Sequence, residues 1–337
     1  MSYFIFGGTG FIGTHLASLL HEVHPAAKIY NLDIIEPGTP LPTVKNYKPA
    51  LRKGEEHAAT FIYCDVRQTI ELEKVNITPD DVIFNFAAVH RTPGHPDPAY
   101  FETNIRGAEN VCTFAERHGI RKIVFTSSIA PYGAAEELKE ETTLPMPNTP
   151  YGISKLVAEK IHQTWQAGGE GRQLTIVRPG VVFGRGENGN FTRLYWGIRG
   201  HKFMYPGRKD TIKACIYVKE LVRFMLYRLE HHDSGVELYN CCYEPAYTIE
   251  HIVESMKRVT NMKVKVPFMP GWLIMTAAGI AGALGSPMGI CPARVRKLQI
   301  STNICGKKLS ASGYRFRYTF EEALADWYKD NGNLYLQ

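Results

Sequence analysis

The first fourteen residues constrain this chain most strongly, because three glycines stand between a short apolar run and a helix. Residues 3–6 are aromatic or β-branched and predict a buried strand. Gly7, Gly10 and Gly13 then allow a tight turn into a helix that begins near Phe11. The N–H groups at such a helix start face outward, and glycines leave room for an anion. The sequence therefore predicts a site for the pyrophosphate of a dinucleotide.

The second half of this fingerprint is an acid at the end of the next strand. Residues 28–32 form another apolar run, and Asp33 closes it. A carboxylate at this place accepts hydrogen bonds from both ribose hydroxyls of NAD and repels the 2′-phosphate of NADP. Glycine turns alone also arise for steric reasons. The order of strand, glycines, helix, strand and acid nevertheless favours a dinucleotide site, and we predict NAD as the cofactor.

Composition excludes several other classes of protein. The 337 residues, 44% of them hydrophobic, can form a large α/β domain and a smaller second one. The net charge of +6 is not concentrated in a Lys and Arg run, so we expect no nucleic-acid partner and an acidic substrate. The seven cysteines have no CxxC or metal-ligand spacing, and the histidines form no ligand set. We expect reduced thiols, no metal and, since no leader precedes the first strand, a cytoplasmic protein.

Strands alternate with helices through the first half of the chain. Four prolines after Asp33 predict a surface excursion. Further strands are expected at residues 60–63, 82–86 and 122–125, and a helix is expected at residues 100–118. This alternation predicts an α/β fold with a Rossmann-type, doubly wound parallel sheet. We expect residues 1–180 to form the NAD-binding domain, and residues 181–337 to form mainly a substrate-binding α+β domain with segments that return to the Rossmann core.

Three strand ends supply further candidates for the cofactor site. Asp65 follows the third strand and is suited to accept the adenine amino group, to cap a helix from Thr69, or to do both. Ala87 and Ala88 follow the fourth strand, where small residues let the backbone approach a cofactor. Asn104 lies near the start of the next helix.

A tyrosine and a lysine four residues apart open a later helix. Tyr151 and Lys155 share one face of it, and its apolar positions are Val157, Ile161 and Trp165. A lysine ammonium stabilises a nearby phenolate, and the positive nicotinamide of NAD adds to the effect. We therefore expect the Tyr151 pKa to fall from about 10 towards neutrality, which would make this phenol a general base.

Taken together, these motifs resemble the extended short-chain dehydrogenase/reductases. The matching segments are residues 7–13, 65–67, 85–88, 103–110, 127–133, 151–155 and 178–180. The resemblance implies that Ser128, Tyr151 and Lys155 form a catalytic triad and that the substrate is a sugar attached to a diphosphate. The residues assigned to the cofactor are Gly7, Gly10, Phe11, Ile12, Gly13, Asp33, Asp65, Val66, Ala87, Ala88, Asn104, Lys155 and Pro179.

Two residues next to Ser128 indicate the branch of the family. The resemblance implies an acidic residue there in sugar dehydratases and decarboxylases, whereas this chain has Ile129 and Ala130. Epimerases at C4 and keto-sugar reductases remain. Biosynthetic reductases typically use NADPH, so the NAD-type Asp33 favours an epimerase. An oxidoreductase of a hydrophobic alcohol, similar to hydroxysteroid dehydrogenases, and a non-catalytic NAD-binding regulator stay as alternatives, although the intact triad argues against the regulator.

The second half carries a looser resemblance to epimerases of bacterial surface-polysaccharide pathways. It is similar to those that convert N-acetylglucosamine to N-acetylgalactosamine on UDP or on undecaprenyl diphosphate. Lys213 aligns with an arginine on the diphosphate, which keeps the charge but loses the bidentate fork. The other substrate candidates are Ser128, Asn190, and Arg294 or Arg296. His90 and Arg91 are candidates as well, although a packing or surface role is equally open for these two residues. We also expect a homodimer.

One uncharged stretch, residues 271–285, allows two interpretations. It is interrupted by glycines and is shorter than the roughly 20 apolar residues that span a bilayer. It is either a helix packed on its own domain or an apolar helix in the membrane interface. The basic residues Arg294, Arg296 and Lys297 follow it, so peripheral membrane contact through residues 271–284 is one prediction.

Overall fold

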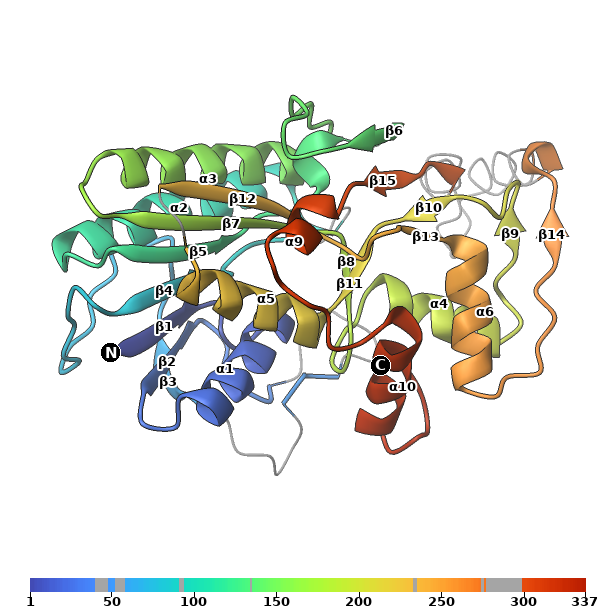
Figure 1. The fold of residues 1–337 in the computed structure, drawn as a ribbon, viewed down its shortest axis with the longest axis horizontal. Coiled ribbons are helices and arrows are strands. Elements are labelled where there is room, and N and C mark those ends of the chain that lie inside the picture. The colour runs from blue at the N-terminus through green and yellow to red at the C-terminus, as the bar shows by residue number, and fades with distance from the viewer. Residues whose placement is uncertain are drawn as a thin grey trace.

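Seven parallel strands form the sheet on which the rest of the molecule is built (Figure 1). The computed structural model describes residues 1–39, 48–51, 58–90, 94–133, 135–232, 235–273, 276 and 299–337. The strand order is β12-β7-β5-β4-β1-β2-β3, so the order reverses beside β1. The strands are β1 Ser2–Phe6, β2 Lys28–Asp33, β3 Thr60–Tyr63, β4 Val82–Asn85, β5 Lys122–Thr126, β7 Gln173–Pro179 and β12 Val236–Cys241. The predicted doubly wound α/β fold is confirmed, and ligands bind such sheets at the carboxyl ends of the strands beside the reversal.

Helices cover both faces of this sheet. The helices α1 (Phe11–Val23) and α5 (Val218–Glu230) pack on one face, and α2 (Asp97–Arg117) and α3 (Pro150–Ala167) pack together on the other (Figure 1). All five residues of β1 are buried between these layers, which explains why they form a continuous apolar run.

The remaining elements form a smaller unit beyond the carboxyl ends of the strands. A four-stranded sheet has the order β13-β10-β15-β6, and two further pairs join β11 with β8 and β14 with β9. Its strands are β6 Ala135–Lys139, β8 Val181–Phe183, β9 Tyr205–Pro206, β10 Ile212–Lys213, β11 Cys215–Tyr217, β13 Tyr247–Thr248, β14 Phe268–Met269 and β15 Thr302–Ile304. Its helices are α4 Asn190–Arg199, α6 Ile249–Val259 and α10 Phe320–Asp330, whereas η1 Ala130–Tyr132 contacts α3 and α9 Lys307–Ala311 packs on β12. An aromatic core that includes Phe183, Tyr217 and Trp327 fills the centre of this unit.

Three local predictions need correction. No helix follows Asp65, because the Gln68 N–H bonds the Asp65 carbonyl in a turn. Val157 is 36% exposed, whereas Ile161 and Trp165 pack in the core, so the apolar stripe predicted for α3 is only partly its core face. The segment after β2, which was predicted to lie on the surface, is partly buried. Ala50 is buried, and a β-carbon at Gly186 would lie 2.5 Å from the Ala50 Cα.

The described residues contain neither a membrane-spanning helix nor a metal-ligand cluster. Among them no helix has the length and apolar character that crossing a membrane requires. Within the same ranges no group of three or more His, Cys, Asp or Glu side chains is arranged to hold a metal ion. The six cysteines in these ranges are free and buried.

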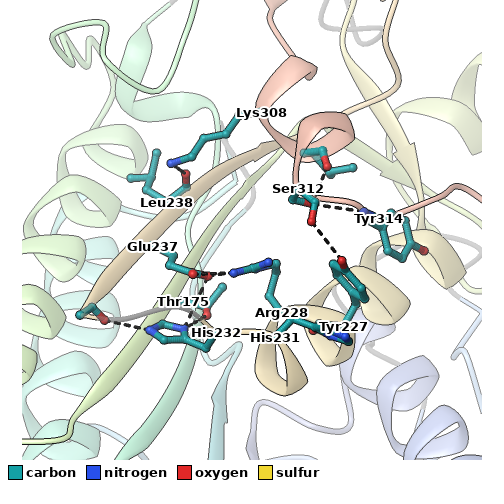
Figure 2. A network of polar contacts seen from close by, with 12 residues as sticks. Thr175, Tyr227, Arg228, His231, His232, Glu237, Leu238, Lys308, Ser312 and Tyr314 are labelled. Carbon is teal, nitrogen blue, oxygen red and sulfur yellow. Dashed lines mark hydrogen bonds and ion pairs between the residues drawn. The ribbon is translucent and has the colours of Figure 1, made fainter.

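A buried ion pair attaches the edge strand β12 to α5 (Figure 2). The Arg228 guanidinium donates to both carboxylate oxygens of Glu237 at 3.0 and 2.6 Å. The ring of His232 lies against the same carboxylate, with Nδ1 at 3.5 Å, and also contacts the Thr175 hydroxyl of β7 at 3.1 Å. Both charged side chains are almost fully buried. This contact lies at the amino ends of the strands, away from the edge at which ligands bind.

We predict that Arg228→Ala lowers the free energy of unfolding by about 3–5 kcal/mol, because Glu237 would stay buried without its partner. The matched control is Arg121→Ala, which removes an exposed pair with Asp80 and should change stability far less. Urea unfolding of both variants measures the difference. Equal losses would mean that the buried pair has no special role.

Candidate active site

The glycine turn between β1 and α1 is packed too closely for side chains. Gly7 has a φ of +78°, and a β-carbon there would lie 2.7 Å from the Ala87 backbone nitrogen. A β-carbon at Gly13 would lie 2.5 Å from the Gly8 Cα. Gly10 is the N-cap residue of α1 and makes no side-chain cap hydrogen bond. The turn therefore presents backbone N–H groups at a helix start, as a pyrophosphate site requires.

Asp33 stands at the end of β2 against this turn. Its carboxylate accepts hydrogen bonds from the N–H groups of Thr9, at 3.1 Å, and Ile35, at 3.2 Å. Burial raises the pKa of Asp33, and these backbone hydrogen bonds oppose the rise. The acid and the glycine turn predicted from the sequence thus lie side by side. Phe11 and Ile12, at the start of α1, are half-buried against the aromatic core of the smaller unit.

The turn after β3 is held against α2. Arg67 pairs with Asp65 at 2.6 Å, and this hydrogen-bonded pair lowers the pKa of Asp65. Val66 is buried below it, where a β-carbon at Gly107 would lie 2.9 Å from the Val66 side chain. The Asn110 amide donates to the Val66 carbonyl at 2.8 Å. These contacts fix the Asp65–Val66 peptide at the carboxyl edge of the sheet.

Asn104 fixes the loop after β4 to α3. Its side chain accepts from the Val89 N–H at 2.8 Å and donates to the Val89 carbonyl at 3.1 Å. It also donates to the Ser154 hydroxyl at 2.8 Å, and that hydroxyl donates to the Tyr151 carbonyl at 2.9 Å. Because Ala87 and Ala88 belong to this loop, their position depends on Asn104.

The structure brings the three catalytic candidates together. Ser128 lies beside Tyr151, where hydrogen bonding from the Ser128 side chain acts to lower the pKa of the phenol. Lys155 is one turn further along α3, and its Nζ donates to the carbonyl of Thr126 at 2.5 Å. Thr149 caps the start of α3 by accepting from the Gly152 N–H, which places Tyr151 in the first turn.

The electrostatics of this site differ from the prediction. Burial raises the pKa of Tyr151 to about 12, although the Ser128 hydrogen bond acts in the opposite direction. Burial lowers the pKa of Lys155 to about 7, and Glu159 opposes that change. Without a cofactor the predicted lowering of the Tyr151 pKa is not seen, because desolvation of the phenolate outweighs its hydrogen bond. A lowering requires positive charge beside the phenol, from a protonated Lys155 and from the nicotinamide of NAD.

The substrate candidates are more scattered. Asn190 is the first residue of α4 and is exposed, and its side chain accepts from Arg193 at 2.7 Å. Lys213 lies in β10 and donates to the Ile300 carbonyl at 2.7 Å. His90 is exposed after β4. The candidates Arg91, Arg294 and Arg296, with Lys297, lie outside the described residues.

Pro179 closes β7 beside the candidate catalytic residue Ser128. Its carbonyl accepts from the N–H of Ile129, the residue after Ser128, at 3.3 Å.

Two buried charged residues beside the three catalytic candidates were not identified from the sequence. Glu159 and Arg178 are almost fully buried and form an ion pair between α3 and β7. The signal was present, since positions 151, 155 and 159 are four residues apart and share one helix face.

Comparison with known proteins agrees with this geometry. The model of the NAD dependent epimerase/dehydratase family matches residues 3–242, and the chain belongs to that family. It is 30% identical, over 95% of its length and 92% of the relative's, to N-acetyl-alpha-D-glucosaminyl-diphospho-ditrans,octacis-undecaprenol 4-epimerase of Escherichia coli O157:H7. It is also 30% identical to UDP-glucose 4-epimerase of Lacticaseibacillus casei, over 80% of this chain and 85% of the other.

A solved structure with the same fold is UDP-glucuronic acid 4-epimerase from Bacillus cereus in complex with NAD. The TM-score is 0.75 at 19% identity, with 99% of this chain and 97% of the other covered. The predictions of family, of NAD as cofactor and of an NAD-dependent epimerase are confirmed.

We predict that Asp33→Asn weakens NAD binding about tenfold or more and reduces discrimination against NADP. The variant keeps one acceptor oxygen for the Thr9 N–H but loses the charge that strengthens hydrogen bonds to the ribose and repels the 2′-phosphate. Titration of each nucleotide gives both dissociation constants. Glu36→Ala, an exposed acid nearby, is the control and should leave them unchanged. A variant that still rejects NADP as strongly as the wild type would contradict the assignment.

Proposed function

We propose that this protein is an NAD-dependent 4-epimerase of a sugar attached to a diphosphate. N-acetylglucosamine on UDP or on undecaprenyl diphosphate is the substrate class to test first, in a pathway of surface-polysaccharide synthesis. The observation that carries the proposal is the meeting of Ser128, Tyr151 and Lys155 at the sheet edge that also holds the glycine turn. The epimerase from Escherichia coli that is 30% identical along nearly the whole chain supports this substrate class.

The residues of the site have distinct roles in the proposed reaction. Bound NAD would supply a hydride acceptor and return the hydride. Tyr151 removes the proton of the sugar 4-hydroxyl, and Ser128 hydrogen-bonds the same oxygen. The ammonium of Lys155 stabilises the Tyr151 phenolate. The resulting 4-keto sugar turns about its diphosphate link, so that Tyr151 returns the proton after reduction of the opposite face.

The residues next to the serine support an epimerase over a dehydratase. The side chains of Ile129 and Ala130 offer no proton donor for elimination, and the Ala130 N–H donates to the Ser128 hydroxyl oxygen at 3.1 Å. The backbone thus holds the serine in place. The NAD-type acid Asp33 likewise favours an enzyme that keeps and regenerates its cofactor over an NADPH-consuming reductase.

We assign the NAD site to residues 1–180 and the sugar site mainly to residues 181–337. The proposed NAD contacts are Gly7, Gly10, Phe11, Ile12, Gly13, Asp33, Asp65, Val66, Ala87, Ala88, Asn104, Lys155 and Pro179. The proposed substrate contacts, besides Ser128, are His90, Asn190 and Lys213. The feature that fits a nucleotide best is the glycine turn, because no side chain covers the backbone N–H groups at the start of α1.

An assay without added cofactor tests the function. UDP-N-acetylglucosamine, UDP-glucose and undecaprenyl-diphosphate-linked N-acetylglucosamine are each incubated with the protein, and the 4-epimers are resolved by chromatography. We expect epimerisation of at least one, and a loss of at least about 100-fold in Tyr151→Phe with nucleotide still bound.

Tyr100→Phe is the matched control for Tyr151→Phe. It removes a phenol whose ring centre lies 6.3 Å from that of Tyr151, and it should stay close to the wild type. Net oxidation that requires free NAD would identify an oxidoreductase instead, and no product with any of the three substrates would overturn the proposal.

We further propose that the protein acts at the cytoplasmic face of the membrane. Phe268, Trp272 and Leu273 are 52%, 72% and 41% exposed; Phe268 lies just before the uncharged segment, and Trp272 and Leu273 lie at its start. Apolar surface contributes roughly 25 cal/mol per Å² when it is buried, so a few such side chains support reversible binding. Most of the predicted contact segment, residues 274–275 and 277–284, lies outside the described residues.

Co-sedimentation with liposomes of anionic phospholipid tests this contact. We predict that the wild type sediments and that Trp272→Glu does so less, because a charge would replace the most exposed ring of the segment. Tyr63→Glu is the control, since Tyr63 is similarly exposed, at 68%, but lies at the end of β3. A wild type that stays in the supernatant would rule out the contact.

A homodimer is proposed through the outer faces of α2 and α3. These two helices pack side by side, and α3 exposes Ile153 and Val157 on its outer surface. A monomer mass at micromolar concentration in light scattering would contradict this assembly.

A further inference from the structure

Four consecutive residues at the end of β5 each contact one residue on the buried side of α3. The pairs are Phe125 with His162, Thr126 with Lys155, Ser127 with Glu159, and Ser128 with Tyr151. The strand end that carries the catalytic serine is therefore held along three turns of the helix that carries the tyrosine and the lysine. Among these four helix residues, Glu159 carries the negative charge. It has no role in the proposed reaction.

Glu159 is held rigidly by three hydrogen bonds. The Ser127 hydroxyl donates to Oε1 at 2.5 Å, and the Arg178 guanidinium donates to Oε1 and Oε2 at 2.8 and 2.6 Å. The carboxylate is 1% exposed. The guanidinium also lies over the ring of Tyr132, 4.7 Å from its centre. A bidentate pair of this kind fixes both the position and the charge of the acid.

The groups around Lys155 come from two elements. They are Glu159 and His162 on α3, and the Phe125 ring and the Thr126 carbonyl on β5. Arg178 on β7 pairs with Glu159. Burial lowers the pKa of His162 to about 4, so this ring is neutral at physiological pH, and its Nδ1–H donates to the Ala158 carbonyl. Among these groups, Glu159 supplies the negative charge.

We propose that Glu159 is a positioning residue that keeps Lys155 protonated in its buried place, and that Arg178 and Ser127 hold it there. The inference rests on the proposed role of Lys155 beside Tyr151. Burial disfavours the ammonium, whereas a fixed carboxylate one turn away favours it. Loss of that carboxylate therefore deprotonates Lys155 at a lower pH, and a neutral lysine no longer stabilises the phenolate.

The test is the pH profile of Glu159→Gln, which keeps the size of the side chain and an acceptor for Ser127 and Arg178. We expect the alkaline limb of kcat to move at least about one pH unit towards acid. At pH 8, kcat then falls about tenfold or more, whereas at pH 6 it stays near wild type and KM is unchanged. Ser127→Ala, which removes one of the three hydrogen bonds to Glu159 but no charge, should move the limb much less. An equal loss of kcat at every pH would mean a merely structural role and overturn the proposal.

A second readout does not depend on catalysis. The titration of Lys155 is followed in the NAD-bound protein by the chemical shift of its labelled Cε, assigned with Lys155→Arg. We expect a lower midpoint in Glu159→Gln than in the wild type, and an unchanged midpoint would overturn the inference. If the wild type epimerises none of the test sugars, the proposed function fails and this titration still decides the role of Glu159. If Glu159→Gln does not fold, Glu159→Asp, whose carboxylate is displaced by one methylene, should give a smaller shift in the same direction.

Discussion

The burial of the Lys155 ammonium is the constraint on which the active site depends. A charged amine removed from water is unstable unless fixed partners replace the solvent. Here the Thr126 carbonyl accepts a hydrogen bond from it and the Phe125 ring lies 4.3 Å away. The same burial raises the pKa of Tyr151. The site therefore disfavours both charged forms that the chemistry needs, and neighbouring charges must restore them.

Two buried ion pairs fasten the same edge of the sheet to helices on opposite faces. Arg178 of β7 pairs with Glu159 of α3 near the carboxyl ends of the strands, and Glu237 of β12 pairs with Arg228 of α5 near the amino ends. The geometry of the two pairs is alike, with two guanidinium nitrogens on each carboxylate. Their consequences differ because the pair near the carboxyl ends lies one helical turn from a buried lysine. A structural clamp can thus acquire a chemical effect from its position alone.

The sequence predicted the strands and the catalytic candidates because each has a local signal. The glycine turn, the acid after β2 and the four-residue spacing of Tyr151 and Lys155 are all read within short windows. Glu159 was missed because the core face of α3 was assigned from its apolar residues, whereas the buried face carries polar ones. Pattern reasoning assumes that buried means apolar, and it fails where buried charges pair across elements distant in sequence. The helix that Asp65 could have capped, one of the two roles left open for it, does not form, because a local turn and Arg67 occupy its backbone and side chain.

The smaller unit was harder to predict because its strands are short and their partners are far apart. Strands of two or three residues carry no periodicity, and the pairing of β10 with β15 joins Lys213 to Thr302. The strand β6 belongs to the first half of the sequence yet pairs with β15. This strand follows η1, which begins two residues after Ser128, and β15 lies between β6 and the β10 strand of Lys213. The candidate catalytic serine and the candidate diphosphate ligand are therefore linked through one small sheet that short-range sequence patterns do not reveal.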